Sequence, residues 1–81
     1  MKNVTIYTTP SCGWCRTTKD YFKEHNIQYN EINVAADAAA RGEMIQKSGQ
    51  MGVPVIDIEG EIVVGYNQPR LARLLEISEP A

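Results

Sequence analysis

Hydrophobic and polar positions recur with two different periods along the chain, and the changes of period predict its elements. Residues 4–8 (VTIYT) are β-branched and aromatic with period two, which is typical of a strand. Over residues 13–25 the larger side chains recur every three or four positions, which predicts a helix that ends near Asn26. Polar residues alternate along 27–34, so a second strand is predicted there, at a sheet edge.

The second half of the chain contains four further predicted elements. Residues 35–47 are rich in alanine and predict an amphipathic helix that packs closely on a sheet. Two short apolar runs, 53–58 and 61–64, predict strands. A leucine stripe over 70–77 predicts the last helix.

Several single residues mark the expected ends of these elements. Asp37 suits the start of the alanine-rich helix because a carboxylate interacts favourably with the helix dipole. Glu59 and Gly60 fit a tight hairpin turn of the primed type. Pro54 is expected at the first turn or edge of its strand, and Pro69 near the first turn of the last helix.

The predicted order is therefore βαβ, then α, then a ββ hairpin, then α. The first βαβ unit is expected to be parallel and right-handed, and the hairpin antiparallel. This order predicts an α/β chain with a mixed four-stranded sheet and helices on both faces. With 81 residues, we expect one domain that spans residues 1–81.

Charge and hydropathy exclude some classes of function. Lys and Arg total 8 and Asp and Glu total 10, for a net charge of −2, which argues against nucleic acid or an anionic membrane as the main partner. The chain has no apolar run of about 18 residues that would span a bilayer. Its N-terminal residues lack the apolar region of a signal peptide, so we expect a cytoplasmic protein.

The candidate chemistry lies in Cys12 and Cys15, the two cysteines of the chain. At the start of a helix they would share one face, with Cα atoms about 5–6 Å apart, which a disulfide can span. Unpaired N–H groups and the helix dipole stabilise a thiolate at that position, and Arg16 adds a positive charge beside it. In a cytosolic protein this spacing favours a redox dithiol.

Other interpretations of the cysteine pair stay open. A closed zinc site needs four ligands, and His25 would lie about 15 Å along the helix from Cys15. A permanent disulfide across so short a loop would add little stability. The remaining alternatives are inert thiols and a zinc or iron–sulfur module that shares cysteines across two chains. Within one chain we predict no metal site.

Three segments together resemble the glutaredoxin family of the thioredoxin superfamily. They are 7–15 (YTTPSCGWC), 52–54 (GVP) and 64–67 (VGYN). The resemblance includes the glutaredoxin-like redoxins that supply electrons to ribonucleotide reductase. It implies a thioredoxin fold, thiol–disulfide oxidoreductase activity, and a cis Pro54 that faces the dithiol.

The resemblance also implies roles for individual residues. Cys12 would be the nucleophile and Cys15 the resolving thiol, and the backbone of Val53 would pair with an extended substrate. Trp14 stands where many members have tyrosine, and we expect it to be partly exposed. The expected substrate-binding residues are Thr9, Trp14, Val53, Pro54, Gly65, Tyr66 and Asn67.

The chain departs from the family pattern at positions that bear on glutathione. Thr9 stands where a lysine is common, Asn67 where acidic residues are common, and Gly13 where many members have proline. No tightly bound cofactor is expected, and glutathione would be a co-substrate at most. We expect a monomer that reduces protein or mixed disulfides and is itself reduced chiefly by a flavoprotein such as thioredoxin reductase.

Overall fold

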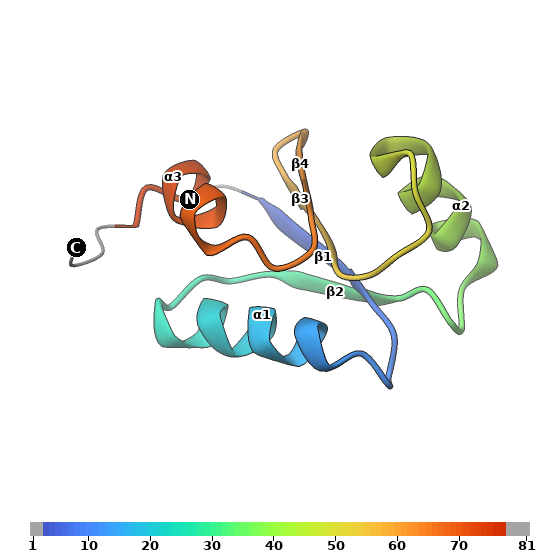
Figure 1. Cartoon of the computed structure of the whole chain (residues 1–81), viewed down its shortest axis with the longest axis horizontal. Helices are drawn as coiled ribbons and strands as arrows, with labels where there is room; N and C mark the ends of the chain where they lie inside the picture. The colour runs from blue at the N-terminus through green and yellow to red at the C-terminus, as the bar shows by residue number, and fades with distance from the viewer. Residues whose placement is uncertain (1–2, 78–81) are drawn as a thin grey trace.

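The computed structural model describes residues 3–77 and contains the seven elements in the predicted order (Figure 1). No helix within this described range is long and apolar enough to cross a membrane. The elements are β1 (Val4–Thr8), α1 (Gly13–Glu24), β2 (Asn30–Asn33), α2 (Ala38–Ser48), β3 (Val55–Ile58), β4 (Glu61–Val64) and α3 (Gln68–Leu74).

The four strands form one mixed sheet in the order β2-β1-β3-β4. β1 pairs in parallel with β2 and antiparallel with β3, and β4 pairs antiparallel with β3. Ile6 lies opposite Glu31 on one side and Ile56 on the other. The predicted mixed four-stranded sheet, with 27–34 at its edge, is confirmed.

Helices cover both faces of the sheet, as predicted. Because side chains alternate along a strand, one face carries Val4 and Ile6, which pack with Phe22 of α1 and Leu71 of α3. The other face carries Tyr7 and Val55, which pack with Met44 of α2. The site described below lies on the first face, at the start of α1.

Two strands begin later than predicted. β2 begins at Asn30 rather than 27, because the Ile27 N–H donates to the Phe22 carbonyl at 2.8 Å and closes the end of α1. Asn26 adopts the left-handed conformation (φ 56°) at that helix end, as expected. β3 begins at Val55 rather than 53, since Pro54 has no N–H to donate to a strand ladder.

The later helices begin at capping side chains. α2 starts at Ala38 rather than 35, because the Asp37 carboxylate accepts the Ala40 N–H at 3.0 Å. α3 starts earlier than predicted, at Gln68 after the Asn67 cap, with Pro69 in its first turn as expected, and it ends at Leu74 rather than 77.

The hairpin turn is of the primed type that the sequence predicts. Glu59 has φ 53° and Gly60 has φ 94°. Positive φ at both central residues matches the twist of the flanking strands. The β3–β4 hairpin therefore forms as expected.

Candidate active site

Cys12 is the residue that caps α1. Its backbone is extended (φ −86°, ψ 112°), and its Sγ accepts a hydrogen bond from the Cys15 N–H at 3.1 Å. Oxygen side chains usually occupy this cap position, and here a sulfur replaces them. Unpaired N–H groups and the positive end of the helix dipole therefore lie next to the half-buried Cys12 sulfur.

Cys15 lies one turn further along α1 and is only 1% exposed. Burial, followed by a hydrogen bond with Cys12, raises the pKa of the Cys15 thiol to about 12. Both cysteines are thiols in this structure. The pair thus combines one accessible sulfur with one buried and protonated thiol.

The backbone before Pro54 faces the accessible sulfur. The Cys12 thiol donates to the Val53 carbonyl at 3.7 Å, and the Val53–Pro54 peptide bond is cis, as the family resemblance implies. Beside them lies a groove of about 270 Å³. The residues that line the groove are Trp14, Val53, Pro54, Gly65 and Tyr66.

Two aromatic rings form one wall of this groove. Trp14 is 63% exposed, as expected, and its ring stacks on Tyr66 at 5.9 Å with an interplanar angle of 18°. Tyr66 also meets the ring of Tyr21 edge-on at 5.9 Å. These contacts connect the loop after β4 to α1 across the groove.

The residues expected to bind substrate fall into two sets. Five of them line the groove, whereas Thr9 and Asn67 do not. The Thr9 carbonyl accepts the Cys12 N–H at 3.3 Å, and the Asn67 side chain caps α3 by accepting the Arg70 N–H at 3.3 Å. The Gly65 N–H already donates to the Pro54 carbonyl at 2.8 Å, so it is engaged within the protein.

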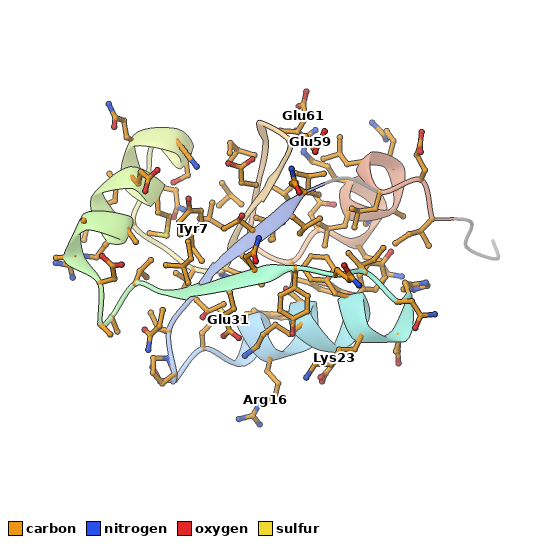
Figure 2. All side chains as sticks on the ribbon, turned by 180° about the vertical axis from the view of Figure 1, so that it is seen from behind. Tyr7, Arg16, Lys23, Glu31, Glu59 and Glu61 are labelled. Carbon is orange, nitrogen blue, oxygen red and sulfur yellow. The ribbon has the colours of Figure 1, made fainter. Side chains whose placement is uncertain are left out.

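The basic residues Lys47 and Arg16 do not line the groove either. Lys47 donates to Tyr7 Oη at 3.0 Å and to Asp57 at 2.9 Å. Arg16 is exposed, and Figure 2 shows its side chain pointing away from the body of the molecule. Neither side chain supplies a positive charge to the groove.

Two features near the dithiol were not predicted. The Gln50 side chain bonds both the N–H and the carbonyl of Gly52, which shapes the loop before Pro54. Lys19, four residues after Cys15, forms an ion pair with Glu31 of β2 at 2.9 Å. The helical spacing from Cys15 could have drawn attention to Lys19, but the position of Glu31 depends on the strand register.

The described residues offer no metal site of the usual composition. Between residues 3 and 77 no group of three or more His, Cys, Asp or Glu side chains is placed to hold an ion. His25 caps the far end of α1, next to the Tyr21 ring. A larger hollow of about 990 Å³ lies near that end, lined by residues such as Ile27 and Leu75, and neither cysteine contributes to it.

A thioredoxin-like sheet, a dithiol at a helix start and an adjacent cis-proline loop define the class of thiol–disulfide oxidoreductases. The glutaredoxin family model matches residues 4–63. A glutaredoxin-like 8.6 kDa protein from the rubredoxin operon of Clostridium pasteurianum is 48% identical over 73 residues, which cover 90% of this chain and 97% of the relative. The chain belongs to the glutaredoxin family and is a thiol–disulfide oxidoreductase.

Solved structures agree with this assignment. A point mutant of the thioredoxin-like protein BC3987 is similar with a TM-score of 0.89 and 35% identity, over 96% of this chain and all of that one. The glutaredoxin-like NrdH-redoxin of Escherichia coli is similar with a TM-score of 0.79 and 26% identity, over 98% of this chain and 97% of that chain. The thioredoxin fold predicted from the sequence is confirmed.

Proposed function

We propose that this protein reduces protein disulfides and mixed disulfides with Cys12 as the attacking thiol and Cys15 as the resolving thiol. The observation that carries the proposal is the contrast between the two sulfurs. Cys12 is accessible at the N-terminal end of α1 and faces the Val53 carbonyl, whereas Cys15 is buried one turn behind it.

The reaction has two displacement steps. The Cys12 thiolate attacks one sulfur of the substrate disulfide, which forms a mixed disulfide and releases the first substrate thiolate. The Cys15 thiol then loses its proton and attacks Cys12 Sγ, and the second substrate sulfur leaves and takes up a proton. The two cysteines together lose two electrons, and the substrate disulfide gains them. An extended substrate would lie in the groove beside Val53.

Single cysteine variants test these roles. Cys12→Ser should abolish reduction of a protein disulfide such as that of insulin, measured with dithiothreitol as the electron donor. Cys15→Ser should instead accumulate a mixed disulfide with the substrate, visible by mass spectrometry of the intact adduct. Turnover that survives in Cys12→Ser would overturn the assignment.

We further infer that glutathione is a poor reductant for this protein and that a flavoprotein such as thioredoxin reductase serves instead. Glutathione carries two carboxylates and an ammonium group, and charge-assisted hydrogen bonds to such groups contribute about 1.5–3 kcal/mol each. The groove residues Trp14, Val53, Pro54, Gly65 and Tyr66 carry no charge. The related NrdH-redoxin is described as having a thioredoxin-like activity profile, which supports the same preference here.

The choice of reductant can be measured directly. We expect NADPH consumption with thioredoxin reductase and a disulfide substrate, and little consumption with glutathione and glutathione reductase. Thr9→Lys combined with Asn67→Asp restores the charged residues common in the family and should raise the glutathione-dependent rate. Rapid wild-type turnover with glutathione and none with thioredoxin reductase would contradict the inference.

A further inference from the structure

The resolving step requires a thiolate at a buried position. Cys15 is 1% exposed, and its thiol pKa is raised to about 12 by burial and by the hydrogen bond with Cys12. On the proposed function, this thiol must nevertheless lose its proton at neutral pH to attack Cys12. A group that stabilises negative charge at Cys15 would therefore govern the rate of this step.

Besides burial, which has the largest effect, three groups from two segments act on the Cys15 thiol. Within α1, the positive charge of Lys19 lowers the Cys15 pKa, and the helix cap Cys12 raises it. From the segment after β1, a Thr9 backbone hydrogen bond lowers it. Lys19 lies four residues after Cys15, so the two side chains emerge on neighbouring positions of the helix surface. Glu31 of β2 forms an ion pair with Lys19.

Lys19 is held in place rather than free in solvent. Its Nζ lies 2.9 Å from Glu31 Oε2, with 26% of the lysine side chain exposed. The same carboxylate oxygen accepts a hydrogen bond from the buried Thr8 hydroxyl at 2.9 Å. The β1–β2 register places Glu31 opposite Ile6, on the face that α1 covers, and Figure 2 shows Glu31 between β2 and α1.

The ion pair is charged at neutral pH. The hydrogen bond to Glu31 raises the pKa of Lys19, and the hydrogen bonds from Lys19 and Thr8 lower the pKa of Glu31. Lys19 therefore keeps its proton and acts as a fixed positive charge rather than as an acid or base.

We propose that Lys19, positioned by Glu31 and Thr8, stabilises the Cys15 thiolate and so sets the rate of the resolving step. In that step the Cys15 proton passes to water, the Cys15 sulfur bonds to Cys12 Sγ, and the bond between Cys12 and the substrate breaks. The electron pair leaves on the substrate sulfur. Lys19 forms no bond to the reacting atoms, and Glu31 is a positioning residue for Lys19.

The aromatic disulfide DTNB separates the two steps of the proposed reaction. Attack by Cys12 releases one coloured thiolate, and attack by Cys15 on the mixed disulfide releases a second. Stopped-flow absorbance across a series of pH values gives a rate for each phase. Lys19→Gln should slow the second phase by about 3- to 10-fold near pH 7 and move its pH profile upward, because each unit of pKa is a tenfold change in thiolate fraction. The first phase should be unchanged.

Three further variants make the test specific. Lys19→Arg keeps the charge and should restore most of the second-phase rate. Arg41→Gln removes a positive charge from an exposed position on α2, which packs on the opposite face of the sheet, and should change neither phase. Glu31→Gln should slow the second phase because it releases Lys19. A faster second phase in Glu31→Gln would overturn the positioning role, since the Glu31 charge would then merely oppose the thiolate.

The outcomes also separate this inference from the proposed function. A second phase of equal rate in wild type and Lys19→Gln would overturn the role of Lys19 and leave the dithiol reaction intact. If the wild type released no second thiolate, the resolving role of Cys15 itself would fail. Far-ultraviolet circular dichroism and urea midpoints of each variant identify any effect of lost folding, and Lys19→Arg supplies the charge-retaining comparison if Lys19→Gln is destabilised.

Discussion

Cys12 and Cys15 are identical side chains that the fold places in different surroundings. The helix start gives Cys12 a backbone N–H donor and leaves it half-buried next to the groove residue Val53, whereas Cys15 is buried and its thiol pKa is raised to about 12. The reactivity of a cysteine follows its thiolate fraction and its exposure. We therefore expect the two cysteines to differ in reactivity because of one helical turn of depth, since their residue type is the same.

This asymmetry predicts selective alkylation. In the folded, reduced protein at pH 7, iodoacetamide should modify Cys12 and leave Cys15 unmodified, because the Cys15 thiol is both buried and protonated. Intact-mass measurement should show one adduct, and peptide mapping should locate it. Addition of guanidinium chloride should allow a second adduct to form. Equal labelling of both cysteines in the folded protein would contradict the burial of Cys15.

A second residue-scale prediction concerns the ion pair that connects α2 to the sheet. Burial opposes the charge on Asp57, but hydrogen bonds from Lys47 at 2.9 Å and from the Gly60 N–H at 2.8 Å outweigh it and hold the Asp57 pKa below its ordinary value. Its contribution to stability is therefore present above the ordinary carboxyl pKa and is lost as pH falls through the lowered value. Lys47→Met should raise the Asp57 pKa, measured by NMR titration, and reduce the acid-side pH dependence of unfolding. Lys23→Met is the control and should leave both unchanged.

At the scale of elements, α2 contains a glycine that its helix does not require. Gly42 lies inside α2, and a Cβ added there would meet nothing within 4 Å. Gly42→Ala should raise the free energy of unfolding by about 0.5–1 kcal/mol, because alanine loses less backbone entropy in a helix. Gly49 ends the same helix with φ 73°, so Gly49→Ala should destabilise by about 1–2 kcal/mol. Urea unfolding measures the free energy of unfolding of both variants. A lower free energy of unfolding in Gly42→Ala would contradict the open space around that position.

The pattern of hydrophobic and polar positions predicted the order and type of the elements, because six of the seven described elements bury hydrophobic side chains. β2 buries none of its residues, and its polar alternation indicated an edge strand. Element ends were harder to predict, since they depend on single hydrogen bonds such as that from the Ile27 N–H to the Phe22 carbonyl. The spacing of Cys12 and Cys15 was sufficient to predict the dithiol, because the two residues lie within one helical turn of each other. The Lys19–Glu31 pair and the Trp14–Tyr66 stack join residues distant in sequence, and they follow only from strand register and loop path.

At the scale of the whole molecule, the groove forms where two parts of the chain meet. Trp14 comes from the βαβ unit, whereas Val53, Pro54, Gly65 and Tyr66 come from the segment that contains the hairpin. The sheet joins the two parts through the antiparallel pairing of β1 with β3. The ring of Tyr66 contacts Trp14 and Tyr21 of α1, and these contacts join the two parts of the chain a second time at the surface.

Removal of that ring should affect stability and substrate binding together. Tyr66→Ala loses two aromatic contacts of about 0.5–1.5 kcal/mol each, so the free energy of unfolding should fall by about 1–3 kcal/mol. Because Tyr66 also lines the groove, KM for a protein disulfide should rise several-fold with little change in kcat. Tyr66→Phe keeps the ring and should behave like the wild type in both measurements. Urea unfolding followed by the fluorescence of Trp14, the single tryptophan, gives the first quantity, and initial rates give the second. An unchanged KM in Tyr66→Ala would mean that substrate does not contact this wall of the groove.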